Sequence, residues 1–461
     1  MLHQKLTAAT VHRAELIAAF SHALDLTEGQ PEGHCIRACW IAAQIGRAIG
    51  LSETQRGELY YTVLLKDLGC SSNAARICEL YEADDLAFKR GYKTVGTSLA
   101  ATLHFVFSRT AEGKPLLRRA AKIGSILANG SRIVDEMIGS RCTRGADIAR
   151  DLRFPDAVCS GIYGLDEHWD GSGRPGRLSG ERIPLYARIA LLAQVIDVFH
   201  AHAGRDAAIG EARRRSGSWF DPALVAAFDS VAARESFWAS LASPLLEIQV
   251  VAMAPADDEL AVDEDYLDAI VAAFGQVIDA KSPFTSGHSA RVADLAHAIA
   301  IASGFHSERA RLLRRAAYLH DVGKLGVSSA ILEKPAALDE REWEEMRGHA
   351  EHTRAILGRI GALSALADIA AAHHERLDGL GYPLALGEGS IARETRIITV
   401  CDFFDALTAD RPYRAAMPVE EALRIMNQSV DVAIDAECFA LLRKTVLGAE
   451  PLFTSASGPR R

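Results

Sequence analysis

The sequence predicts a mainly α-helical protein built from two tandem helical domains. Two observations support this prediction. Apolar residues recur at i, i+3 and i+4 spacing through most of the chain, and the two halves carry matching motifs in the same order. The clearest helical stretches are 290–302, 307–319, 338–360 and 418–426. With 461 residues, and at about 100–200 residues per domain, the chain is too long for a single small module.

We expect a first domain at 1–253, a short acidic linker at 254–265, a second domain at 266–448 and a disordered tail at 449–461. The linker combines Pro255 with a run of Asp and Glu, and the tail is rich in Ser, Gly, Pro and Arg. Strand-like alternation is rare. Only 245–252, which is rich in β-branched residues, predicts a strand.

The matching motifs indicate a duplication. His34 and Asp67 each lie 254 residues before a matching residue, His288 and Asp321. Further along, the offset between WDGSGRP and LDGLGYP falls to 208, so the first half holds 46 additional residues between 71 and 140. This insertion includes the apolar 95–107 and the basic 118–122. It is either packed on its own domain or serves as a lid or partner surface.

Composition excludes several classes of function. Fifty-one Lys and Arg against sixty Asp and Glu give a formal charge of −9, which disfavours a nucleic-acid polymer as partner. No apolar run reaches the ~18–20 residues of a membrane span, and the first residues lack the apolar core of a signal peptide. The eight cysteines are dispersed and form no C-x-x-C pair, as is typical of a reduced compartment. We therefore expect a cytoplasmic protein without a membrane partner.

The second half concentrates metal-binding side chains. A single histidine on an apolar helix is usually a core residue, but that explanation fails for seven donors together. They are enough for two divalent ions bridged by a carboxylate, and nitrogen and oxygen donors suit Fe or Mn best, with Zn possible. Two close ions provide a hydroxide nucleophile and neutralise a phosphate ester. The donors are His288, His320, Asp321, His349, His373, His374 and Asp402.

Residues 281–430 resemble an HD-GYP domain, a branch of the HD metal-dependent phosphohydrolases. The resemblance covers six motifs, which together are far more specific than an HD or GYP pair alone. They are GHSARVA at 287–293, HDVGK at 320–324, ILEKP at 331–335, His349, HHERLDGLGYP at 373–383 and DFFDALTADRPYR at 402–414.

The resemblance implies two tandem HD-type bundles and a cyclic di-GMP phosphodiesterase that forms pGpG, GMP or both through a metal-bridging hydroxide. Asp321 and Lys324 would be catalytic. One metal would be bound by His288, His320, Asp321 and Asp402, and a second by Asp321, His349, His373 and His374. Lys324, Tyr382, Arg411 and Arg414 would contact phosphate or guanine. Glu375, Asp378 and Asp405 are candidates for orienting the histidines. Because Phe284 stands where some members carry a further carboxylate, we expect two metals rather than three.

Two alternatives remain open. One is a phosphodiesterase for another cyclic dinucleotide, such as cyclic GMP-AMP, because no residue distinguishes one purine from another. The other is a non-catalytic receptor or scaffold that binds cyclic dinucleotide or docks onto diguanylate-cyclase (GGDEF) proteins. Because every ligand position is filled, catalysis is favoured. A homodimer is also possible.

The first half resembles the same family but has lost most of the site. Lys66 and Arg141 stand at the positions of His320 and His349. Leu165 and Asp166 replace the histidine pair, Gln194 replaces Asp402 and Arg174 replaces Tyr382. We hypothesise that Lys66 and Arg141 substitute for the metals, opposite Asp67 and Asp166. This copy would serve for dimerisation, for packing against the catalytic copy, or for sensing a nucleotide without hydrolysing it.

Overall fold

The chain folds into helices throughout the part that the computed structural model describes, which is residues 12–96, 99–255, 262–412 and 414–448. Within these residues only isolated β-bridges occur and no strand forms, so the predicted mainly α class is confirmed. The predicted tail and residues 256–261 of the predicted linker lie outside the described residues.

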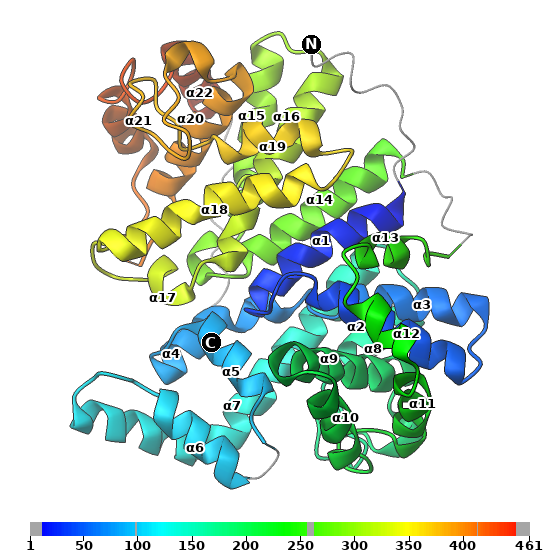
Figure 1. Ribbon diagram of the computed structural model, residues 1–461. Coiled ribbons are helices and arrows are strands. Elements are labelled where there is room, and N and C mark those ends of the chain that lie inside the picture. Colours follow the sequence, from blue (N-terminus) through cyan, green and yellow to red (C-terminus); the bar gives the residue numbers. More distant parts are fainter. Residues whose placement is uncertain (1–11, 97–98, 256–261, 413, 449–461) are drawn as a thin grey trace.

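The first half contains thirteen α-helices among the described residues (Figure 1). A capping box at Ser52 starts the third helix, and the Asp84 carboxylate caps the fifth. The helices are α1 (Arg13–Thr27), α2 (His34–Ala48), α3 (Glu53–Leu64), α4 (Ala74–Tyr81), α5 (Asp85–Lys93), α6 (Leu99–Arg109), α7 (Leu116–Asp151), α8 (Asp156–Tyr163), α9 (Leu185–Ala203), α10 (Arg205–Arg214), α11 (Pro222–Ala232), α12 (Glu235–Leu241) and α13 (Leu246–Val251).

The second half continues from α14 to α22. Asp263 caps the first of these helices, which begins at Glu264 and so takes in the last two residues of the predicted linker. A capping box at Asp339 starts the long α18. The elements are α14 (Glu264–Asp279), α15 (His288–Ala302), α16 (Ser307–Leu319), the 3₁₀ helix η6 (Val322–Gly326), α17 (Ser329–Leu332), α18 (Glu340–Gly358), α19 (Ser364–Ala371), α20 (Arg393–Thr408), α21 (Val419–Asn427) and α22 (Ala436–Gly448).

The strand predicted at 245–252 is wrong, because this segment forms the short helix α13. Leu246 and Val250, one helical turn apart, are its buried residues. A lone strand would leave its backbone groups without partners, whereas a helix satisfies them within the segment.

Equivalent contacts in the two halves match the two sequence offsets. Glu167 accepts hydrogen bonds from the amides of Gly176 and Leu178, and Glu375 accepts them from Leu384 and Leu386. In the same way, a Cβ atom at Gly69 would overlap the carbonyl of Arg141, and one at Gly323 would overlap that of His349. The second pair of contacts places Arg141 where the catalytic half has His349.

The insertion forms α5, α6 and the N-terminal part of α7, which lie at the lower left of Figure 1. Phe88 of α5 packs against Phe105 of α6, with the ring centroids 5.2 Å apart. Lys89 of α5 donates to the carbonyls of Thr27 and Cys70, which fastens the insertion to its own half. Of the two expectations for the 46 residues, packing on their own domain is therefore what the structure shows.

The halves meet at α1 and α14, which lie side by side at the centre of the molecule (Figure 1). Phe20 and Phe274 are separated by the repeat offset of 254, and their rings stack with centroids 3.8 Å apart. Such a contact between two equivalent residues is expected where two copies pack about a two-fold axis. One continuous hydrophobic core runs through both.

A buried ion pair forms a second junction between the halves. Lys281, just after α14, donates to Asp85 Oδ2 at 3.1 Å, and both side chains are almost fully buried. Asp85 also accepts from the amide of Ser329 at 2.7 Å. A carboxylate at the start of α5 therefore holds two segments of the second half.

We expect Phe20→Ala and Phe274→Ala each to lower the free energy of unfolding by about 3–5 kcal/mol, because each removes a buried ring. The double variant should cost less than the sum, because the two rings contact each other. Urea denaturation of the four proteins measures both effects. Tyr163→Ala, at a half-exposed ring, is the control and should change stability by no more than about 0.5 kcal/mol. Additive losses would contradict direct stacking.

Asp85→Asn should cost roughly 3–5 kcal/mol at pH 7, since it leaves the Lys281 ammonium buried without a carboxylate. Burial raises the pKa of Asp85, but Lys281 and Lys89 outweigh it and hold the pKa below its ordinary value. The difference from wild type is therefore complete above the unfolded-state pKa and shrinks as the pH falls through the folded-state pKa. Denaturation at several pH values tests this. Asp368→Asn, which breaks an exposed pair with Arg354, should change stability by no more than about 1 kcal/mol.

Candidate active site and metal centre

The fold gathers all seven predicted donors in one place. His288 is the first residue of α15, and Gly287 before it has the left-handed φ of 70° that lets the helix start abruptly. His320 and Asp321 follow the end of α16, and the remaining donors come from α18, from the turn after α19 and from α20. All but His374 and Asp402 are fully buried.

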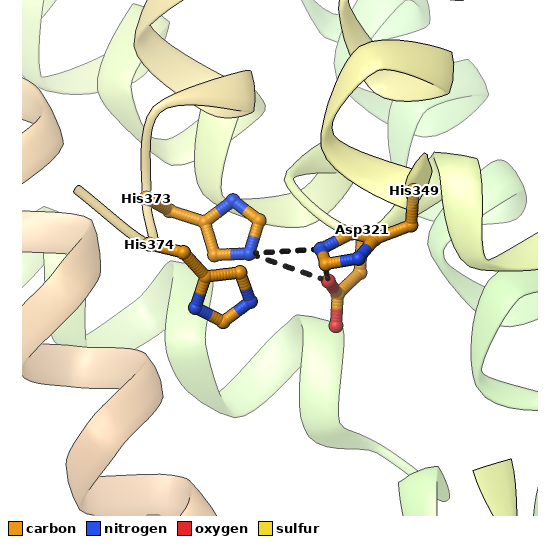
Figure 2. Close-up of side chains that lie close together, drawn as sticks. All are labelled: Asp321, His349, His373 and His374. Atoms are coloured by element: carbon orange, nitrogen blue, oxygen red, sulfur yellow. Dashed lines mark hydrogen bonds and ion pairs between the residues drawn. The ribbon is translucent and has the colours of Figure 1, made fainter. Parts of the chain in front are cut away.

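Asp321 lies at the centre of the donors. Its Oδ2 atom is 3.6 Å from Nε2 of His288 and 3.4 Å from Nε2 of His320. Its Oδ1 atom is 3.6 Å from Nε2 of His349 and 3.5 Å from Nε2 of His373. Figure 2 shows this second group of side chains around Asp321. Each carboxylate oxygen thus faces its own pair of imidazoles.

The remaining donors complete the two groups. Asp402 Oδ1 lies 3.4 Å from Nε2 of His288, on the Oδ2 side of the shared carboxylate. His374 lies beside His373, with ring centroids 4.0 Å apart, on the Oδ1 side (Figure 2). Ligand atoms of His349, His373, His374 and Asp321 all fall within 4.8 Å of one another, a spacing that fits a bound ion.

Hydrogen bonds on the outer side fix the orientation of the imidazoles. Nδ1 atoms of three of them bond to the carbonyl oxygen three residues earlier, at 2.5 to 2.7 Å. These are the pairs His320 with Ala317, His349 with Met346 and His373 with Ala370. Because Nδ1 donates outward, Nε2 presents its lone pair to the centre, as a metal ligand requires.

His288 is oriented by a side chain instead. Its Nδ1 bonds to Asp405 Oδ2 at 2.7 Å, and Arg291 holds the same carboxylate from Nε at 2.6 Å. The prediction that Asp405 orients a histidine is therefore confirmed. The same prediction is wrong for Glu375 and Asp378. Glu375 holds the backbone of the GYP turn, and Asp378 pairs with Arg376.

The electrostatics suit bound cations. Burial raises the pKa of Asp321, but His320 and Lys324 outweigh it and hold the pKa well below its ordinary value. Burial lowers the pKa of His349 to about 3, which keeps that imidazole neutral. Among the described residues, Asp321 Oδ1 is a buried oxygen without a hydrogen-bond partner. Ionised carboxylate and neutral imidazole are the states that bind metals, so the donor set fits divalent ions.

His320 responds differently to its neighbours. Burial lowers its pKa, but the charges of Asp321 and Asp402 outweigh burial and raise the pKa to about 10. A proton on Nε2 of His320 would therefore compensate the two buried carboxylates when no cation is bound there. A divalent ion would compensate the same charges, and its binding would release that proton.

A cavity of about 560 Å³ opens beside the donors and supplies a binding surface. Lys324, Tyr382 and Arg411 line it, in agreement with their predicted contacts to substrate, which stay predictions. Lys324 Nζ contacts Asp321 Oδ2, and the Tyr382 ring lies 4.7 Å from the His374 ring. Arg414 is not part of this lining. Its guanidinium donates to the carbonyls of Ala406 and Leu407 in the last turn of α20, and its predicted substrate contact remains a prediction.

Two residues of this region escaped the sequence reasoning. Trp343 lines the cavity, and Arg347 on the same helix lies over the rings of both Trp343 and Tyr382, at 5.6 and 5.8 Å. For Trp343, the spacing before His349 offers a signal. Trp343, Met346 and His349 follow one another at i+3 on a single face of α18.

The first half shows the predicted substitution of cations for donors. Lys66 Nζ contacts the Asp67 carboxylate and Arg141 contacts Asp166. Burial lowers the pKa of Lys66, but the charge of Asp67 outweighs it and raises the pKa above its ordinary value, which keeps the ammonium charged. The two cations therefore stand beside the same carboxylates that the sequence hypothesis named.

A family model described as an HD domain matches residues 122–224 and 273–438. The chain belongs to the HD-domain family. The second match contains all seven donors, and the first contains Arg141 and Asp166, so the two tandem HD regions of this HD-GYP protein are both recognised. No helix in the described parts of this HD-GYP protein is long and apolar enough to cross a bilayer.

Relatives of this HD-GYP protein include two bacterial phosphodiesterases. It is 51% identical over 433 residues, 94% of both chains, to the Vibrio cholerae protein named 3'3'-cGAMP-specific phosphodiesterase 3. It is 37% identical over 163 residues to the Thermotoga maritima cyclic di-GMP phosphodiesterase, a match covering 35% of this chain and 44% of the relative. A crystal structure of a V. cholerae cyclic GMP-AMP-specific phosphodiesterase superposes with a TM-score of 0.66 at 44% identity, covering 96% of this chain and all of the other.

We expect anaerobically purified protein to hold about two divalent ions per chain. His349→Ala should lose one of them and Asp321→Ala both, because only Asp321 faces both groups of imidazoles. Metal analysis of each purified variant provides the measurement. His352→Ala, at an exposed histidine on the same helix as His349, should keep the wild-type content. Equal losses in the two site variants would contradict two separate ions.

Proposed function

We propose that this chain is a metal-dependent phosphodiesterase that hydrolyses a cyclic dinucleotide. The observation that carries the proposal is the shared carboxylate of Asp321, with a pair of imidazoles on each of its oxygens beside a cavity lined by cationic side chains. Two divalent ions bound there would generate a nucleophile from water near neutral pH and neutralise the phosphoryl charge.

Each protein group then has a distinct task. His288, His320 and Asp402 would hold one ion, and His349, His373 and His374 the other, with Asp321 between them. Lys324 would bind a non-bridging phosphate oxygen, because its ammonium stands at the edge of the donor cluster and lines the cavity. Arg411 offers a guanidinium to the second phosphate.

Tyr382 and Trp343 provide rings for the purines. Arg347 lies over both rings, so the three side chains form one wall of aromatic and cationic faces. A flat heterocycle with a polar edge suits such a wall. The cavity of about 560 Å³ lies within the usual range for small-molecule sites, about 300–1,000 Å³.

The substrate we favour is 3'3'-cGAMP. The family resemblance alone led us to expect cyclic di-GMP, with cyclic GMP-AMP as the alternative. Similarity across 94% of the chain to a relative named for 3'3'-cGAMP supports the alternative, whereas the cyclic di-GMP enzyme of T. maritima matches about a third of the chain. Iron or manganese as the metal, a cytoplasmic location, a homodimer and docking of GGDEF proteins stay predictions.

The test compares turnover of 3'3'-cGAMP and cyclic di-GMP at equal concentration, with products separated by chromatography. We expect faster hydrolysis of 3'3'-cGAMP and none by Asp321→Ala. Lys324→Met should lower the rate by about 10²–10³-fold while keeping its metal, because it removes a charge placed at the phosphate. Lys444→Met, at an exposed lysine on α22, is the matched control and should behave as wild type.

Two results would overturn the proposal. Faster hydrolysis of cyclic di-GMP would reject 3'3'-cGAMP as the preferred substrate but would leave the phosphodiesterase reaction in place. Bound nucleotide without turnover in metal-loaded protein would reject the reaction and favour the receptor alternative.

A further inference from the structure

The first half contains a cavity of about 680 Å³ at the place where the catalytic half has its active site. Its floor includes Arg141, Asp166 and Gln194, which occupy the positions of His349, His374 and Asp402. The described floor therefore lacks the histidine donors of the second half, although Glu28 and Cys70 of its lining form a smaller group of possible metal donors with Asp67. The cavity itself, however, is larger than its catalytic counterpart.

The insertion supplies most of the walls. Helices α5, α6 and α7 surround the floor with apolar side chains, and α7 contributes a stripe with helical spacing. The principal apolar residues are Leu103, Val106, Ile126, Ile133, Val134 and Met137. Aliphatic walls of this kind bind an apolar body rather than a sugar or a hydrated ion.

Cationic side chains outnumber acidic ones at the floor. Five cations line the cavity with the carboxylates of Glu28 and Asp166, and two of the five, Arg174 and Arg215, are paired with Asp135 and Glu211 behind the lining. Burial lowers the pKa of His168 to about 4, so this lining residue is neutral at pH 7. The cations are Lys89, Lys93, Arg141, Arg174 and Arg215.

Lys93 places a second ammonium group at the floor. Its Nζ atom forms an ion pair with Glu28, 2.7 Å from Oε2, a distance at which the ammonium donates to that carboxylate. Lys89 lies 3.5 Å from the same carboxylate and donates to the carbonyls of Thr27 and Cys70. One carboxylate therefore serves two ammonium groups, and Lys93 keeps donors for a further acceptor.

We propose that this cavity is an effector site that binds an organic anion with an apolar body. The anionic group would meet Lys93 and Arg141 at the floor, and the apolar body would fill the space between α6 and α7. The ligand would not be hydrolysed there, because Lys66 and Arg141 occupy the positions of metal-binding histidines.

Helix α5 connects this site with the catalytic half. Phe88, Lys89 and Lys93 of α5 line the cavity, while Asp85 at its first position holds Lys281 and the amide of Ser329. Lys281 in turn lines the catalytic cavity and donates to the carbonyl of Leu325, the neighbour of Lys324. A ligand that shifts α5 would thus move groups beside the active site.

The binding test uses two probes, decanoate and the fluorescent sulfonate 8-anilinonaphthalene-1-sulfonate, with GMP as a polar comparison. Gly130 lies within the apolar stripe of α7, and a side chain added there meets open space. Gly130→Phe should therefore fill the cavity without disturbing the fold. Gly124→Phe places the same ring on the same helix, also in open space, at a residue outside the lining, and serves as the matched control.

We expect both probes to bind wild type and Gly124→Phe with one site per chain, and to bind Gly130→Phe at least 10-fold more weakly. Equal binding by the two variants, or no binding to wild type, would overturn the site. If GMP binds and decanoate does not, the proposal that the ligand has an apolar body is wrong.

A second readout tests the effector role, which rests on the proposed phosphodiesterase activity. Decanoate should change the turnover of 3'3'-cGAMP by wild type and Gly124→Phe, and not by Gly130→Phe. Binding to an active enzyme without any change in turnover would overturn the effector role. The binding measurement does not need turnover, so failure of the proposed activity is distinguishable from failure of the site.

Discussion

The buried carboxylate of Asp321 is the constraint on which the catalytic half depends. It faces four imidazoles and an ammonium group, and its charge in a buried position is stabilised only if cations surround it. The helices that deliver these side chains must therefore converge on one point. The arrangement of these helices follows from the need to surround the Asp321 carboxylate. His320 and Asp321 follow the end of α16, and His288 is the first residue of α15. The other donors come from α18, from the turn after α19 and from α20.

The hydrogen bonds behind the imidazoles extend the same constraint to the backbone. Three of the histidines bond to carbonyls three residues earlier, so the side chain is oriented by the local helix geometry. His288 is the first residue of α15, and its Nδ1 bonds to Asp405 of α20 instead. Arg291, also on α15, holds the same carboxylate. The exception thus follows from the position of His288 in the chain.

The origin of each contact explains which parts of the site and the fold could be predicted from the sequence. The donors could be predicted because each lies in a contiguous motif whose residue types are themselves the chemistry. Trp343 and Arg347 could not, because an aromatic residue and an arginine on a helix are equally typical of a solvated face. The strand predicted at 245–252 was wrong because a strand needs a partner strand, and the β-branched composition of a segment does not tell whether the fold provides one. The stacking of Phe20 on Phe274 depends on how the two halves pack, and a repeat offset alone does not fix that arrangement.

The same electrostatic demand accounts for the first half. Asp67 is as buried as Asp321, so loss of the surrounding histidines without replacement would leave a carboxylate without compensation. Lys66 supplies a covalently attached cation beside it, and Arg141 does the same for Asp166. On the hypothesis that these cations replace the metals, this region would hold together without an ion. The turn held by Glu167 and the buried pair of His34 with Asp197 persist because they stabilise the bundle, whatever the chemistry of the site. Once the charge is fixed, the space above it is free to take a different ligand, and the insertion encloses that space.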